Sequence, residues 1–179
     1  PLTLPAHTSL LTGRVLPAHG VFNNLTFALP ETVPTIADRL RAAGYATGAF
    51  VSAPVLASRY GLARGFEEYD DRIRSNKGPT GVTGHPERSG VETVRAASTF
   101  IDRAGSRPAF LFVHLYEPHR PYAPPDDVAA RFAGDRYQGE VAMADRAIGQ
   151  LLDALKQAGR AEHALVVVTA DHGESLGEH

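Results

Sequence analysis

Amphipathic segments alternate with short apolar runs along this chain. Apolar residues recur at helical spacing over residues 87–104 and 137–158, the period of helices that cover one side of a core. Residues 109–113 (AFLFV) and 165–168 (LVVV) are apolar runs of strand length, and residues 46–53 (ATGAFVSA) form a third candidate strand. Runs that are apolar throughout, rather than alternating, are typical of parallel strands buried on both faces.

Two further helices are predicted from their end signals. Residues 3–12 have Pro5 in the first turn and Gly13 after the last residue, as proline and glycine favour these helix ends. Thr35 and Asp38 stand at the spacing of a capping box at the start of another helix. The pattern as a whole predicts an α/β fold, a mostly parallel sheet with helices on both faces, whose ligands bind at the carboxyl ends of the strands.

The composition is that of a soluble globular protein and excludes several function classes. Of 179 residues, 43% are hydrophobic and 21% are charged, and the net charge of -2 contains no long run of one sign. We therefore expect no nucleic-acid partner, and the apolar runs are too short for a membrane-spanning segment. Because cysteine is absent, any metal must be held by oxygen and imidazole ligands.

Chemically active side chains gather just beyond two of the candidate strands. Residues 114–122 (HLYEPHRPY) and 169–174 (TADHGE) are rich in imidazole and carboxylate groups, and we expect them to be spatial neighbours. Asp171 and His172 could ligate one divalent ion, or serve only as turn residues. His119, between two prolines, is either a rigidly held functional group or a solvated loop histidine.

Thr3 raises the same kind of alternative at the other end of the sequence. It precedes Pro5 at a helix N-terminus, where its hydroxyl could cap the helix or act as a nucleophile beside unpaired N–H groups. His7 lies one turn further on, close enough to bind the same anion. His114 falls inside the strand run and could point to either face, and we expect it to be a core histidine satisfied by a hydrogen bond.

Three blocks of sequence together resemble the sulfatase family of the alkaline phosphatase superfamily. TLPAHTSLLTGRVLPAHGV resembles the family's nucleophile segment, and FLFVHLYEPHRPYAPP is similar to the strand and loop whose histidine meets the substrate. VVVTADHGESLGEH resembles the segment in which Asp followed by His or Asn ligates the metal. Their order and spacing make the joint match specific, whereas each block alone is weak.

The nucleophile segment departs from the sulfatase pattern. Sulfatases make formylglycine from the first residue of a Cys/Ser-x-Pro-x-Arg motif, and those places here hold Thr3, Pro5 and His7. The family's lysine and histidine also fall near Ser52 and Pro54. A T-x-P-x-H segment is instead similar to the phosphodiesterases, phosphoglycerol transferases and phosphoethanolamine transferases of the superfamily, so the resemblance favours phosphodiester chemistry over formylglycine-type sulfate ester chemistry.

The resemblance implies a metal-dependent hydrolase or transferase acting on sulfate or phosphate esters. Thr3, His7 and His119 would be catalytic, with His119 and His7 also binding the substrate. Asp171, His172 and Thr3 would hold a divalent metal ion, with Ca, Mn, Zn and Mg all compatible with such ligands. The substrate would be a small-molecule, glycan-linked or lipid-linked ester, and the resemblance leans towards the cell envelope or an extracytoplasmic location.

The same resemblance predicts that residues 1–179 are part of one sulfatase-like catalytic domain, truncated at both ends. In the family, a strand with acidic metal ligands precedes the nucleophile segment and further ligands follow the Asp-His segment. We therefore expect these 179 residues alone to bind metal weakly and to turn over little. The alternative is a catalytically inactive binding module with the sulfatase fold, suggested by the departures in the nucleophile segment.

Overall fold

The fold is built on a small parallel sheet. The computed structural model describes residues 2–73 and 87–177. Its strands are β1 (Ala46–Phe50), β2 (Glu68–Asp70) and β3 (Ala109–Val113), in the order β2-β1-β3, and both neighbouring pairs run parallel. The carboxyl ends of all three strands therefore meet at one edge, where Phe50 of β1 stands opposite Asp70 and Val113.

Helices make up most of the remaining regular structure. They are α1 (Thr3–Thr12), α2 (Leu16–His19), α3 (Ile36–Ala42), α4 (Gly90–Arg103), α5 (Asp126–Ala130) and α6 (Arg136–Gln157), with short 3-10 helices η1 (Pro54–Leu56), η2 (Ser58–Tyr60) and η3 (Ala161–His163). The predictions for 3–12, 87–104 and 137–158 are confirmed to within a few residues by α1, α4 and α6. None of the helices in the described ranges has the length and apolar character needed to cross a bilayer.

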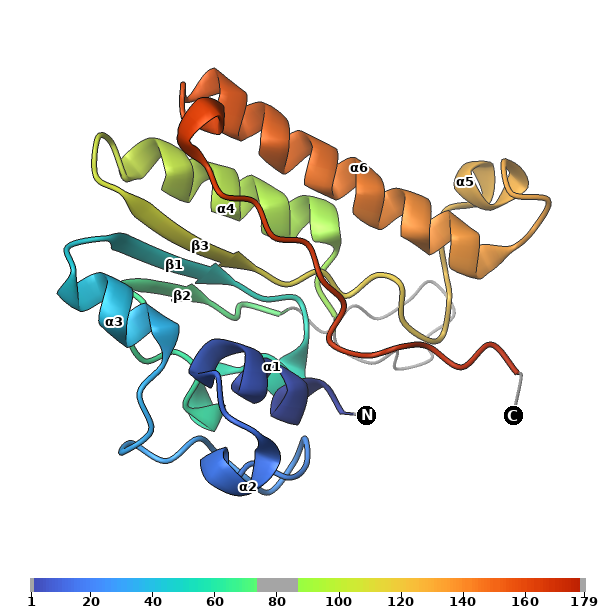
Figure 1. The fold of residues 1–179 in the computed structure, drawn as a ribbon. Coiled ribbons are helices and arrows are strands. Elements are labelled where there is room, and N and C mark those ends of the chain that lie inside the picture. Colours follow the sequence, from blue (N-terminus) through green and yellow to red (C-terminus); the bar gives the residue numbers. More distant parts are fainter. Residues whose placement is uncertain (1, 74–86, 178–179) are drawn as a thin grey trace.

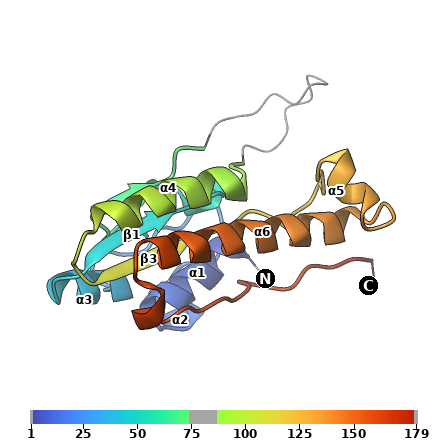
Figure 2. The same cartoon turned by 90° about the horizontal axis from the view of Figure 1, so that it is seen from above.

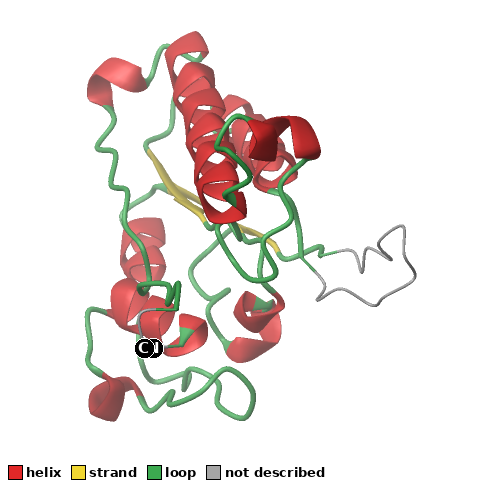
Figure 3. Ribbon diagram, turned by 90° about the vertical axis from the view of Figure 1, so that its right-hand side faces the viewer, coloured by secondary structure: helices red, strands yellow, loops and turns green. Residues whose placement is uncertain are grey.

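The sheet has helices on both faces, as predicted (Figures 1 and 3). Alternate residues of β3 point to opposite faces. Phe110 and Phe112 pack into a core cluster with residues of α1 and α3, whereas Leu111 and Val113 pack into a second cluster with α4. Viewed from above, α4 and α6 lie side by side across the same face (Figure 2).

Side-chain caps fix where three helices begin. The predicted capping box is confirmed at α3, where Thr35 Oγ1 accepts from the Asp38 N–H at 3.2 Å and Asp38 Oδ2 accepts from the Thr35 N–H at 2.7 Å. Ser89 caps α4 and Asp135 caps α6 in the simpler one-bond manner. Each such cap contributes about 1 kcal/mol.

Residues 165–168 do not form a strand, and here the prediction is wrong. The segment follows η3 but joins no ladder, and Leu165 and Val167 are 91% and 76% exposed. The segment and β3 line a common cavity of about 1960 Å³. A strand forms only when its backbone groups find a partner, and the described residues place none beside 165–168.

Candidate active site

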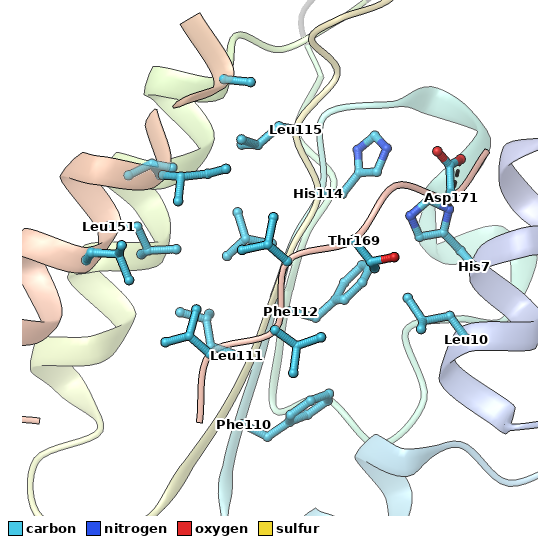
Figure 4. Close-up of a pocket in the computed structure, with 18 of the residues that line it drawn as sticks. His7, Leu10, Phe110, Leu111, Phe112, His114, Leu115, Leu151, Thr169 and Asp171 are labelled. Atoms are coloured by element: carbon cyan, nitrogen blue, oxygen red, sulfur yellow. Dashed lines mark ion pairs between the residues drawn. The ribbon is translucent and has the colours of Figure 1, made fainter. Parts of the chain in front are cut away.

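The cavity between β3 and the last segment carries imidazole and carboxylate side chains at the carboxyl end of β3, which is called its polar end below. Along most of its length it is lined by apolar side chains such as Phe110, Phe112 and Leu151, but the lining becomes polar at the carboxyl end of β3. There His7 from α1, His114 and Asp171 turn towards one another (Figure 4). The start of α1, the residues after β3 and the segment after residue 168 thus converge where parallel sheets bind ligands.

Thr3 is the first helical residue of α1, not its cap. The capping position belongs to Leu2, whose side chain makes no capping hydrogen bond, so the alternative that Thr3 caps the helix is wrong. Asn24 Oδ1 instead accepts from the Leu4 N–H at 2.9 Å, and Pro5 has no N–H to satisfy. The Thr3 hydroxyl is left to face His172, with its Oγ1 3.4 Å from Nε2 of that ring.

The ring of His172 presents a lone pair to Thr3. Its Nδ1 lies 2.8 Å from the carbonyl oxygen of Gly173, and since a carbonyl can only accept, Nδ1 carries the proton in that contact. In the neutral ring Nε2 is then unprotonated. This backbone-held orientation is the one commonly found in metal-binding histidines.

His7 supports both Thr3 and Asp171. Its Nδ1 donates to the carbonyl oxygen of Thr3 at 2.8 Å and lies 3.6 Å from Asp171 Oδ2. The side chain is almost fully buried, and burial lowers its pKa from the usual value despite the opposing effects of Thr3 and Asp171. Neutral His7 therefore has its only N–H turned towards α1 and Asp171.

Asp171 and His172 place two side-chain donors of the kind that bind divalent ions close together. Asp171 Oδ2 lies 3.6 Å from His172 Nε2, close to the separation of two ligands on one divalent ion. Oxygen and imidazole donors suit such an ion, but these are two conventional ligands where four or more are needed. No group of three His, Asp or Glu side chains suited to a metal occurs among the described residues.

The loop that carries His119 is held by a carboxylate that sequence analysis did not single out. Glu140 of α6 is buried, and its two oxygens accept from the backbone N–H groups of His119 at 2.9 Å and Ala123 at 2.7 Å. Burial raises the pKa of Glu140, although both hydrogen bonds act against the rise. His119 lines the cavity, and its ring lies against that of Tyr116 at an interplanar angle of 36°, with ring centroids 4.3 Å apart.

The predicted proximity of the two polar segments is confirmed. Arg120 Nη2 donates to the carbonyl oxygen of Ser175 at 2.9 Å, and its Nε lies 3.7 Å from Glu174 Oε1. The loop after β3 and the segment containing Asp171 are therefore neighbours.

His114 belongs to this site, although its sequence position suggested only a core residue. Its N–H extends the β1–β3 pairing by donating to Phe50 at 2.9 Å, while its ring lies 4.9 Å from the His7 ring, edge to face. Burial, with help from His7, lowers the pKa of His114 to about 3. The available signal was alternation along the strand, which puts residue 114 on the same side as Phe110 and Phe112.

Comparison with known proteins gives a consistent result. A family model described as Sulfatase matches residues 1–179. Human arylsulfatase H is 34% identical over 83 residues, which is 46% of this chain and 15% of that protein.

Solved structures share the fold at low sequence identity. Ps i-CgsB in complex with k-i-k-neocarrahexaose superposes with a TM-score of 0.65 at 22% identity over 88% of this chain. The lipoteichoic acid synthase LtaP from Listeria monocytogenes has a TM-score of 0.64 at 19% identity, and the phosphonate monoester hydrolase of Agrobacterium radiobacter has 0.62 at 19%, each over 88% of this chain. The chain spans 45%, 40% and 50% of these three structures respectively.

Proposed function

The chain belongs to the sulfatase family, and on that premise we propose that it carries the nucleophile of an enzyme that hydrolyses or transfers phosphate or sulfate esters. One observation carries the proposal. The Thr3 hydroxyl, freed from any capping role, faces an imidazole nitrogen whose lone pair is fixed by a backbone hydrogen bond. A hydroxyl held beside such a group at a ligand-binding edge of the sheet has the arrangement of an activated nucleophile.

In the proposed reaction Thr3 Oγ1 attacks the phosphorus or sulfur atom. The Thr3 hydroxyl gives its proton to water, a bond forms between Oγ1 and that atom, the bond to the leaving oxygen breaks, and the leaving oxygen takes up a proton. Water or an acceptor alcohol then attacks the covalent intermediate and releases Thr3. We assign proton donation to the leaving oxygen, or contact with the transferring group, to His119, which lines the same cavity.

The neighbouring residues hold this nucleophile in place. His7 fixes the carbonyl of Thr3 and lies 3.6 Å from Asp171. Asp171 and His172 would hold a divalent cation, which when bound lowers the pKa of a hydroxyl and offsets negative charge on the ester. His7 was expected to donate to the ester, but its N–H already serves Thr3, so such a donation would require a protonated ring, which burial disfavours.

Phosphodiester chemistry is favoured within this class. Threonine at position 3 cannot become formylglycine, so the attacking group is the hydroxyl itself. Two of the structural neighbours are a phosphonate monoester hydrolase and a lipoteichoic acid synthase, and both names describe phosphorus chemistry. A glycan-linked ester suits this proposal, since another neighbour binds a neocarrahexaose, and the lipoteichoic acid synthase supports a lipid-linked ester.

The experiment compares release of nitrophenol from a phosphodiester and from a sulfate monoester by the full-length protein. Thr3→Ala is expected to abolish turnover, Thr3→Ser to retain part of it, and chelation of divalent cations to reduce it. Thr12→Ala is the matched control, because Thr12 lies at the opposite end of the same helix. Its hydroxyl donates to the carbonyl of Thr8 and accepts from the N–H of Arg14. Full activity of Thr3→Ala would refute the nucleophile, and preference for the sulfate ester would refute the phosphodiester assignment.

An inactive binding module is the second candidate, because only two conventional metal ligands converge among the described residues. It predicts binding of divalent metal and of inorganic sulfate or phosphate by the full-length protein without turnover of either ester. Thr3-dependent turnover would exclude this alternative.

A further inference from the structure

Two histidines from different elements lie together at the polar end of the cavity. His7 comes from α1 and His114 from the end of β3, and their ring centroids are 4.9 Å apart. Both line the cavity, on the side where Asp171 also lies (Figure 4). The proposed reaction uses His7 to support Thr3, but it leaves His114 without a role.

The hydrogen bonds of His114 determine which of its nitrogens carries the proton. The backbone N–H of Ser52 points to His114 Nδ1 at 3.4 Å, which favours Nδ1 as the accepting nitrogen. The neutral ring then carries its proton on Nε2. Among the described residues, Nε2 has no hydrogen-bond partner.

The backbone of His114 is unusually well fixed for a residue just beyond a strand. Its N–H donates to Phe50, and its carbonyl accepts from Ser52 Oγ at 2.8 Å. Ser52 is itself buried and shares a hydrogen bond of 2.7 Å with Thr93 Oγ1 of α4. The ring is therefore carried on a rigid support, as a preorganised donor requires.

We propose that His114 binds the transferring phosphate or sulfate group directly, donating a hydrogen bond from Nε2 as a neutral imidazole. This inference rests on the proposed function. It supplies the N–H donor that sequence analysis expected from His7, whose own N–H is turned towards the Thr3 carbonyl. A neutral donor stabilises negative charge that develops on an oxygen without placing a cation beside the neutral ring of His7.

Two substitutions separate this role from a structural one. Asn can replace Nδ1 as the acceptor for Ser52 but has no donor at the place of Nε2, whereas Gln can place an N–H near Nε2 and loses the Ser52 contact. His114→Asn is expected to lower kcat/KM about 10²-fold, the usual effect of losing one such donor. His114→Gln is expected to retain most of the activity. The matched control is His163→Gln, since His163 is exposed in η3 at the far end of β3.

Anion binding is measured for the same two variants, and the imidazole of His114 is observed by NMR in the wild-type protein. Titration with inorganic phosphate and with inorganic sulfate is expected to give weaker binding for His114→Asn than for His114→Gln. The ¹⁵N spectrum is expected to show the Nε2–H form of His114, shifted by the anion. A protonated Nδ1, or normal activity and anion binding in His114→Asn, would overturn the proposal.

These measurements keep the two proposals apart. If the wild-type protein turns over neither ester but the anion binds through His114 Nε2, the proposed reaction fails and the anion site stands. If turnover depends on Thr3 while the anion leaves the His114 resonances unchanged, the reaction stands and the role of His114 fails. Should His114→Asn not fold, the ¹⁵N spectrum of the wild-type protein and the Gln variant still decide the question.

Discussion

Glu140 offers the sharpest test of how the fold positions His119. It projects from α6, and its carboxylate accepts from the backbone N–H groups of His119 and Ala123. Both belong to a loop that carries three prolines between residues 118 and 124. Replacing Glu140 with Ala removes both acceptors at once. We expect a less stable protein in which the His119 loop no longer has one fixed position.

The structure sets the size of the effect. A hydrogen bond to a charged group contributes about 1.5–3 kcal/mol, and Glu140 makes two. Burial of the carboxylate, which raises the pKa of Glu140, opposes folding and reduces the net gain. We therefore expect Glu140→Ala to lower the free energy of unfolding by about 2–4 kcal/mol, and Glu140→Gln, which keeps one acceptor oxygen, by about half as much.

Urea unfolding followed by circular dichroism measures this loss, and ester turnover measures the displacement of His119. The Gln variant should recover part of both. Asp153→Asn is the control on the same helix, since the Asp153 pair with Lys156 is exposed and spans 3.7 Å, a geometry worth about 0.5 kcal/mol or less. An unfolding midpoint for Glu140→Ala equal to that of the wild type would refute the argument.

Two further predictions concern the scaffold. A hydrogen bond from Arg72 lowers the pKa of Asp70 to about 2, against 3.8 unperturbed, so the Asp70 carboxylate stabilises the fold above pH 4 and this contribution is lost as pH falls towards 2. The size of this contribution is about 1–2 kcal/mol after allowing for the exposure of Arg72. The urea midpoint of Asp70→Asn should therefore depend less on pH between 2 and 4 than that of the wild type, and an equal pH dependence would contradict the assignment. Gly65→Ala places a Cβ 2.2 Å from the Asp38 nitrogen at a positive φ of 79°, so we expect a loss of at least about 3 kcal/mol in unfolding free energy. Gly13→Ala, also at positive φ but with nothing within 4 Å, should lose only about 1–2 kcal/mol, and equal losses for the two variants would show that the clash is relieved.

Local patterns in the sequence predict most of the elements, because their causes are local. The period of α4 and α6, the capping box at Thr35 and the apolar run of β3 all depend on residues within one segment. Residues 165–168 show the limit of this reasoning. Their apolar, β-branched composition indicates a strand, but a strand also needs a hydrogen-bonding neighbour, and composition contains no information about where that neighbour lies.

The candidate site likewise contains residues that the sequence predicts and one, Glu140, that it does not. The prediction that the two polar segments meet is confirmed although residues 165–168 join no ladder, and the contact between Thr3 and His172 spans 169 residues. Glu140 could not be found in this manner, because its partners are backbone N–H groups and a carboxylate on an amphipathic helix ordinarily faces solvent. The role of Glu140 becomes visible only once the loop after β3 has been folded against α6.

The three histidines at the polar end show why residue types alone do not assign chemical roles. His7 and His172 each donate from Nδ1 to a backbone carbonyl, whereas His114 accepts at Nδ1 from a backbone N–H. The neutral rings therefore differ in what they present at Nε2, a lone pair from His7 and His172 and a donor from His114. Because every one of these contacts is made to main chain, the fold itself decides which of the three rings presents a lone pair and which presents a donor.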